Sequence, residues 1–172
     1  DFNRVSYISN ISEFINIDKL KNYFDEINSK IIFNIKDFVL ATSELHVRWP
    51  ECEKIPPHQD NFYHCFKDVT SFKILIPLTR FIKPNTFLNY ANVNLNQATL
   101  NHIASSVPAF SSFIPDSIIS NLNLEWINYE FNLGDVLWHS INSIHYANKN
   151  ITNSTSLFLV FRFDEINSII DQ

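Results

Sequence analysis

The residues best suited to chemistry lie in segment 57–63, which reads Pro-His-Gln-Asp-Asn-Phe-Tyr. His58 and Asp60 are two positions apart, so on an extended strand their side chains point to the same face. An imidazole and a carboxylate side by side make two ligands for one metal ion. A third ligand is available in segment 134–145, where His139 and His145 follow a Gly-Asp turn. Two histidines and one carboxylate on one face of a metal form the donor set of non-haem Fe(II) oxygenases.

The other histidines fit this set less well. His46 alternates with an apolar neighbour on an expected strand, which favours a role in the scaffold or behind the ligands. His64 is close to Asp60 in the sequence but lies outside the two motifs. His102 lies in a weakly patterned middle segment, and we expect it to be exposed to solvent.

The composition narrows the class of protein. A chain of 172 residues predicts a single domain over 1–172 with a sizeable core. Sixteen phenylalanines and a single glycine suit a bulky interior of strands and argue against glycine-rich phosphate loops. The net charge of -5 disfavours nucleic acid and anionic membranes as partners. No apolar run is long enough to span a bilayer. The sequence contains no signal for an oligomeric state.

The location we expect is the cytoplasm. The first residues lack the pattern of a secretory signal peptide. Cys52 and Cys65 do not form a disulfide framework, and we interpret them as two reduced thiols.

The elements that position the metal ligands are predicted to be mostly strands. A long helix is expected over 12–29, and short helices are expected over 97–106 and 115–121. A turn is expected at Gly134, the only glycine. The predicted fold is mainly β, a double-stranded β-helix (a jelly roll or cupin-like barrel) with flanking helices, which brings an early and a late strand to one site. The expected strands cover 31–40, 44–49, 70–78, 87–95, 124–131, 136–140 and 156–163.

The two motifs together resemble a known family. The His58-Gln-Asp60-Asn-Phe-Tyr63 stretch precedes an apolar strand, and Gly134-Asp135 precedes another strand and then His145-Tyr-Ala-Asn-Lys-Asn150. Over about residues 45–163 this order resembles the phytanoyl-CoA dioxygenase-like family of Fe(II)/2-oxoglutarate-dependent oxygenases. The resemblance implies that His145 rather than His139 is the distal ligand. Fe(II) would then be held by His58, Asp60 and His145, and 2-oxoglutarate and O2 would take the remaining positions.

The chain departs from the family where the cosubstrate is anchored. The family has an arginine for the far carboxylate of 2-oxoglutarate, whereas this chain has Ser156, eleven residues after His145. A buried dianion needs a cation or several donors at that end. Lys73, which interrupts an apolar strand, is the first candidate, because related jelly-roll oxygenases use a lysine on the equivalent strand. Arg162 is the second candidate because it shares strand parity with Ser156. Hydrogen bonds are expected from three further residues: Asn61, Tyr63 and Ser156.

The function implied is an Fe(II)- and 2-oxoglutarate-dependent dioxygenase that hydroxylates a C–H bond of a small-molecule metabolite or natural product. Asp60 favours hydroxylation over halogenation, because related halogenases have a small apolar residue there that leaves room for chloride. Two alternatives remain open. One is a jelly-roll metalloprotein that does not use 2-oxoglutarate, such as a cupin-like isomerase or another oxygenase. The other is a catalytically silent binding domain.

Overall fold

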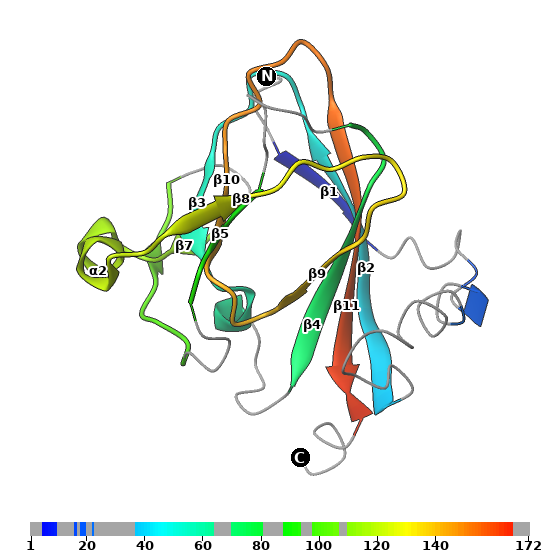
Figure 1. Cartoon of the computed structure of the whole chain (residues 1–172), viewed down its shortest axis with the longest axis horizontal. Coiled ribbons are helices and arrows are strands. Elements are labelled where there is room, and N and C mark those ends of the chain that lie inside the picture. The colour runs from blue at the N-terminus through cyan, green and yellow to red at the C-terminus, as the bar shows by residue number, and fades with distance from the viewer. Residues whose placement is uncertain are drawn as a thin grey trace.

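Two antiparallel sheets face each other and enclose a barrel (Figure 1). The structure, a computed structural model, describes residues 5–9, 16, 18–19, 22, 37–63, 70–80, 88–93, 98–106 and 110–166. The larger sheet has the strand order β1 (Val5–Ser9), β2 (Phe38–Arg48), β11 (Ser156–Glu165), β4 (Ser71–Pro77) and β9 (Leu137–Ser140). The smaller sheet has the order β3 (Ile55–His58), β10 (His145–Ala147), β5 (Leu88–Ala91) and β8 (Trp126–Asn128).

This strand order confirms the predicted jelly roll. The neighbours β2 and β11 are an early and a late strand of the chain, and so are the neighbours β3 and β10. A barrel of this kind brings an early and a late segment to the same site.

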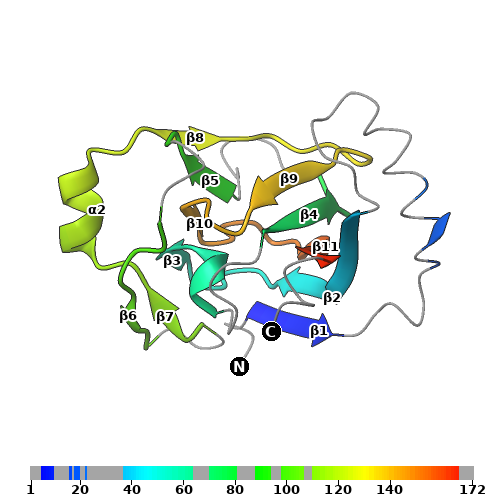
Figure 2. The ribbon, with the colours of Figure 1, turned by 90° about the horizontal axis from the view of Figure 1, so that it is seen from below.

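The remaining elements lie outside the barrel wall. A short ribbon pairs β6 (Ile103–Ala104) with β7 (Ser112–Phe113), and the helix α2 (Asp116–Leu122) follows it. Seen from below, these elements project beyond the smaller sheet (Figure 2). The helix α2 ends at Asn123, whose φ of 47° is in the left-handed region that commonly ends helices. The 3₁₀ turn η3 (Asp60–Tyr63) begins two residues after the end of β3.

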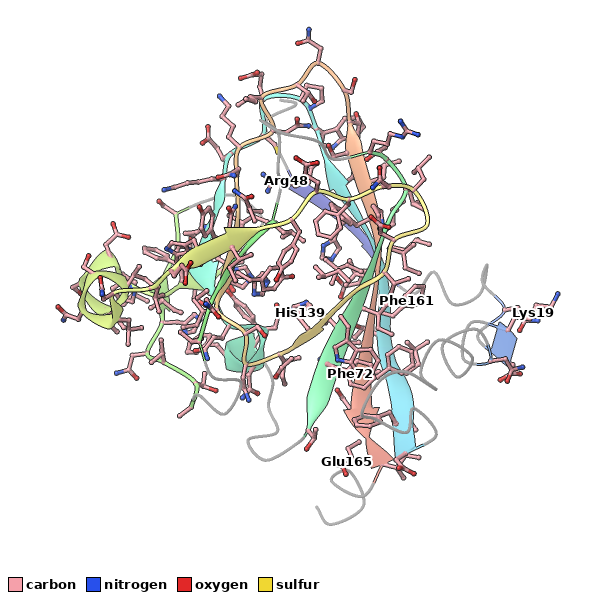
Figure 3. The ribbon with its side chains drawn as sticks, viewed as in Figure 1. Lys19, Arg48, Phe72, His139, Phe161 and Glu165 are labelled. Atoms are coloured by element: carbon pink, nitrogen blue, oxygen red, sulfur yellow. The ribbon has the colours of Figure 1, made fainter. Side chains whose placement is uncertain are left out.

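The larger sheet buries apolar side chains on both faces. Along β11, Phe158 and Val160 point into the barrel, whereas Phe161 and Phe163 point to the outer face. Figure 3 shows Phe72 and Phe161 along this sheet. Each fully buried side chain of this size stabilises the fold by about 1.5–3 kcal/mol. Burial on both faces explains why β4 and β11 are apolar along most of their length.

The strands expected over 70–78 and 156–163 are confirmed, whereas two other predictions were wrong. The two strands expected over 31–40 and 44–49 are, where the structure describes them, one strand, β2. It stays continuous because it pairs along its length with β11, and a bulge between Arg162 and Phe163 takes up the irregularity. No helix forms over 98–106, where β6 lies instead. Most of the helix expected over 12–29 lies outside the described residues, as do His64 and Cys65.

The helix expected over 115–121 is confirmed as α2, and the turn expected at Gly134 is confirmed by a φ of 92°. None of the described helices has the length and apolarity needed to cross a membrane.

Candidate metal centre

The three predicted metal ligands come from the ends of three elements. His58 is the last residue of β3, Asp60 is the first residue of η3, and His145 is the first residue of β10. His58 and His145 are direct partners in the antiparallel pairing of β3 with β10. The edge position of β3 tolerates Pro56 and Pro57, because the strand has a partner on one side only.

His58 and Asp60 do not share a face of one strand, as the spacing suggested. The chain leaves β3 after His58 and turns into η3, and this turn brings the Asp60 carboxylate back toward the imidazole. The side chains therefore meet through a change of direction rather than through strand alternation.

The ligand atoms of the three residues are close enough for a single ion. Asp60 Oδ1 lies 3.8 Å from His58 Nε2, and Asp60 Oδ2 lies 3.8 Å from His145 Nε2. All three ligand atoms lie within 4.8 Å of one another. His58, Asp60 and His145 are each buried.

Both histidines are oriented as metal ligands usually are. His58 donates from Nδ1 to the Pro56 carbonyl at 2.9 Å, and His145 donates from Nδ1 to the Ser143 carbonyl at 3.0 Å. These bonds place the proton on Nδ1 and leave each Nε2 lone pair facing Asp60. Burial, assisted by the nearby His145, lowers the pKa of His58 to about 3, and burial also lowers the pKa of His145. Neutral imidazoles are the form that binds a metal.

The Asp60 carboxylate is held in its charged form. Burial by itself would raise the pKa of Asp60, but the Lys73 ammonium and the surrounding histidines outweigh burial and hold that pKa well below its usual value. Lys73 Nζ lies 2.9 Å from Asp60 Oδ1. Asp60 Oδ2 is buried with no hydrogen-bond partner among the described residues. An ionised carboxylate with a spare oxygen beside two neutral imidazoles fits a divalent cation.

His139 is a third imidazole next to this group. It lies on β9 opposite Lys73 of β4, and its Nε2 is 4.0 Å from Asp60 Oδ2. Burial and the neighbouring His145 keep its pKa well below the usual value. Unlike the two ligand candidates, His139 has no hydrogen-bond partner at Nδ1 within the described part of the chain. The sequence left His139 and His145 open, and the structure places both beside Asp60.

Gln59, between two of the ligand candidates, connects three segments. Its side chain is fully buried and donates to the Asn142 carbonyl at 2.8 Å. It accepts from the Leu100 N–H at 2.7 Å, and the Gln59 backbone N–H donates to His102 Nε2 at 3.1 Å. The expectation that His102 is exposed was wrong, because its ring is half-buried, stacks on Phe62 and accepts this bond.

A cavity of about 260 Å³ opens between the inner faces of the two sheets and includes the candidate metal centre. Two of the predicted cosubstrate residues, Lys73 and Tyr63, line it. The other three, Asn61, Arg162 and Ser156, are not among the described residues that do so.

Asn61 donates to Thr99 and Asn142, and Arg162 donates to Asp164 Oδ2 at 2.8 Å. Tyr63 donates its hydroxyl hydrogen to the Ser112 carbonyl at 2.5 Å.

Sequence reasoning missed that β2 contributes three charged or polar side chains to the cavity: Glu44, His46 and Arg48. His46 donates to Glu44 at 2.7 Å, and this bond lowers the pKa of Glu44. The sequence signal that could have identified these cavity residues is their strict alternation with Leu45 and Val47. Alternation of this kind usually indicates a solvated face, but here the polar face points into the barrel.

The fold and the donor set are those of a cupin-like double-stranded β-helix with one buried candidate metal centre. EvdO2 from Micromonospora carbonacea var. aurantiaca, also solved in complex with 2-oxoglutarate, is similar with a TM-score of 0.75 and 15% identity. The match covers 94% of this chain and 67% of EvdO2. SnoK, a non-heme alpha ketoglutarate dependent carbocyclase from nogalamycin biosynthesis, has a TM-score of 0.72 and 14% identity.

SnoN, a non-heme alpha ketoglutarate dependent epimerase that is also from nogalamycin biosynthesis, has a TM-score of 0.65 and 15% identity. The matches to SnoK and SnoN each cover 94% of this chain and 64% and 63% of those chains, respectively. No protein-family model matches this chain, and no curated protein matches it.

Proposed function

We propose that this protein is an Fe(II)- and 2-oxoglutarate-dependent oxygenase. The observation that carries the proposal is the buried group of His58, Asp60 and His145, with both imidazoles turned by their Nδ1 bonds to offer Nε2. The similar solved structures include one in complex with 2-oxoglutarate and two described as alpha ketoglutarate dependent. The motif order around these residues supports the finer assignment to the phytanoyl-CoA dioxygenase-like family.

The residues of the site have separate tasks in this proposal. His58, Asp60 and His145 hold the iron, which when bound would couple the activation of O2 to the oxidation of 2-oxoglutarate. Lys73 pairs with the Asp60 carboxylate and keeps it ionised. The apolar side chains of Leu75, Phe158 and Val160 limit the entry of water from the barrel interior.

Hydroxylation of a small molecule is the reaction that we assign. The cavity of about 260 Å³ lies near the lower end of the range of ligand pockets, which favours a small molecule as the ligand. Asp60 would supply a carboxylate ligand to the iron, which favours transfer of hydroxyl over transfer of halide. The class of substrate is a metabolite or natural product.

Anaerobic titration with Fe(II) and then 2-oxoglutarate tests the proposal. We expect a weak visible charge-transfer band that needs both additions and is lost in His58→Ala. Metal binding without the band would favour a jelly-roll metalloprotein that does not use 2-oxoglutarate. No metal binding, or unchanged binding in His58→Ala, would favour a silent binding domain. Release of succinate from 2-oxoglutarate in the presence of a panel of small metabolites then identifies the substrate.

A further inference from the structure

A hydrogen-bonded pair, Glu44 and His46, lies on the wall of the cavity opposite the two histidine ligand candidates. Both residues belong to β2 of the larger sheet, and both line the cavity. The ligand candidates His58 and His145 belong to β3 and β10 of the smaller sheet, on the other side of the barrel (Figure 1). The candidate metal centre gives no task to the pair on β2.

The pair holds one oxygen of the Glu44 carboxylate and leaves the other open to the cavity. His46 Nε2 donates to Glu44 Oε2 at 2.7 Å, which fixes the orientation of the carboxylate. The other oxygen, Oε1, has no hydrogen-bond partner among the described residues, and it is not one of their fully enclosed polar atoms. Only 26% of the Glu44 side chain is exposed. The cavity therefore contains one fixed and partly desolvated acceptor.

Glu44 carries a negative charge that no neighbouring cation pairs with directly. Burial lowers the pKa of His46, so the imidazole is neutral at pH 7 and its bond leaves the charge of Glu44 in place. Lys73 acts on Glu44 from a distance, but Lys73 Nζ pairs with Asp60 Oδ1 at 2.9 Å. No ion pair joins Glu44 to a lysine or an arginine in the part of the chain that the structure describes.

The side chains next to Glu44 on the β11 side are apolar. Its direct partner on β11 is Val160, which pairs in turn with Leu75 on β4, and both line the cavity. Arg48 also lines the cavity, but it lies four residues further along β2, which is about 13 Å of extended strand. A carboxylate in such surroundings is stabilised by a cation that donates hydrogen bonds to it.

The structure assigns Glu44 to the recognition of a protonated amine on the substrate, an inference that rests on the proposed function. A second divalent metal is disfavoured, because Glu44 and His46 belong to no group of three possible metal ligands among the described residues. 2-Oxoglutarate is disfavoured because it is a dianion and Glu44 would repel it. A neutral hydroxyl group would donate to the open oxygen but would leave the charge uncompensated. An ammonium group supplies both the donor and the charge.

The cavity also limits the size of this substrate. Glu44 and the three ligand candidates line the same space of about 260 Å³. One small molecule can therefore place its nitrogen at Glu44 while one of its carbon atoms lies at the metal centre. Leu75 and Val160 offer an apolar wall to the carbon chain between these two ends. The substrate class that fits is a small aliphatic amine.

Titration with two matched probes tests this role without a need for turnover. The probes are n-butylamine, which is protonated at about pH 7.5, and 1-butanol, which has the same carbon chain and a neutral hydroxyl group. Calorimetric titrations under argon measure their affinities for the protein loaded with Fe(II) and 2-oxoglutarate. We expect the wild-type protein to bind butylammonium about tenfold or more tightly than 1-butanol. In Glu44→Gln this preference should fall by about tenfold, while the affinity for 1-butanol stays close to the wild-type value.

Two further variants make the result specific. Glu44→Asp keeps the charge on a shorter side chain and should lose part of the preference. It replaces Glu44→Gln if that variant fails to fold, and an undiminished preference would then count against Glu44. Glu130→Gln removes an exposed carboxylate that is not among the described residues lining the cavity, and it should leave the preference unchanged. An equal loss in Glu130→Gln would show a general effect of net charge and would overturn the inference.

The two proposals fail in different ways in this experiment. If Fe(II) and 2-oxoglutarate do not bind together to the wild-type protein, the proposed function fails and the role of Glu44 fails with it. If both bind but the wild-type protein does not prefer butylammonium, or Glu44→Gln keeps the preference, the role of Glu44 alone is wrong.

Discussion

At the scale of single residues, Lys73 presents a positive charge to the same carboxylate that a metal ion needs. Its Nζ lies 2.9 Å from Asp60 Oδ1, and only 17% of the Lys73 side chain is exposed. At about this separation, the interaction energy of two unit charges inside a protein is several kcal/mol. A divalent cation bound to Asp60 must therefore tolerate a positive neighbour.

We predict that Lys73→Met tightens the binding of a divalent metal by about tenfold, because the substitution removes this repulsion. The measurement is a competition titration of the metal-free protein with Mn(II) against a chelator of known affinity. Lys73→Arg is the matched control, because it keeps the charge and should bind the metal as the wild-type protein does. Weaker binding in Lys73→Met would mean instead that Lys73 mainly positions the carboxylate.

The buried imidazoles predict a loss of stability in acid for the metal-free protein. An unfolded histidine takes up a proton below about pH 6.5, whereas burial keeps folded His58 neutral down to a pKa of about 3. The unfolded state binds more protons in this window, so the free energy of unfolding falls as the pH falls. Asp60 acts in the same direction, since its lowered pKa gives stability that is lost as the pH falls toward that pKa.

The titration of His58 alone should change the free energy of unfolding by up to about 1.4 kcal/mol per pH unit. Urea unfolding of the metal-free protein between about pH 7 and pH 5 measures it. His58→Gln has no imidazole to titrate and should show a shallower dependence. An equal slope in the variant and the wild-type protein would contradict the prediction.

At the scale of elements, segment 98–102 acts as a brace for the candidate metal centre although it contains no regular structure. The Gln59 side chain donates to the Ala98 carbonyl and accepts from the Leu100 N–H, and the Gln59 backbone N–H donates to His102 Nε2. The Asn142 carbonyl connects the same glutamine to the turn that precedes His145. Gln59 thus fixes the segment of His58 and Asp60 relative to the turn that precedes His145.

We predict that Gln59→Leu weakens metal binding by about tenfold to a hundredfold, although Gln59 is not a ligand, because the ligands lose their shared support. The loss of three part-buried hydrogen bonds should also cost about 1–3 kcal/mol of unfolding free energy. Isothermal calorimetry with Mn(II) and urea unfolding measure the two effects. Asn92→Leu removes an exposed bond and is the control. Unchanged metal affinity in a destabilised Gln59→Leu would confine Gln59 to folding.

Asn150 closes the loop between β10 and β11. Its buried amide donates to the carbonyls of Arg48, Trp49 and Ser154, and its Oδ1 accepts from Thr152. We predict that Asn150→Asp lowers the free energy of unfolding by about 3 kcal/mol, because a carboxylate would face three carbonyl oxygens. Thermal unfolding measures this, with Asn153→Asp, at an exposed position of the same loop, as the control. Equal stability of the two variants would contradict this role.

Local sequence patterns predicted the strands of the barrel but not how the site is assembled. The apolar run of β4 and the turn at Gly134 depend on nearby residues, so they could be predicted. The continuity of β2 depends on its pairing with β11, and the turn after His58 depends on bonds to segments 98–102 and 141–144. The orientation of Arg48 into the cavity likewise depends on which face of β2 the smaller sheet covers.

At the scale of the whole molecule, the larger sheet separates two apolar clusters with different tasks. The inner cluster, which includes Phe158 and Val160, forms part of the cavity wall. The outer cluster, which includes Phe161, Phe163 and Phe72, is buried on the opposite face and does not line the cavity. Stability should therefore depend on both clusters, whereas ligand binding should depend on the inner one.

Phe158 and Phe161 provide a matched test, because both lie on β11 and are 1% and 0% exposed. We predict that Phe158→Leu and Phe161→Leu each lower the free energy of unfolding by about 1–2 kcal/mol, since each removes a similar buried area. Only Phe158→Leu should change the affinity of the Fe(II)-loaded protein for 2-oxoglutarate, because only that side chain borders the cavity. Urea unfolding and anaerobic calorimetry measure the two quantities. An equal change of affinity in Phe161→Leu would show that the two faces of the sheet are coupled and that the outer cluster also shapes the site.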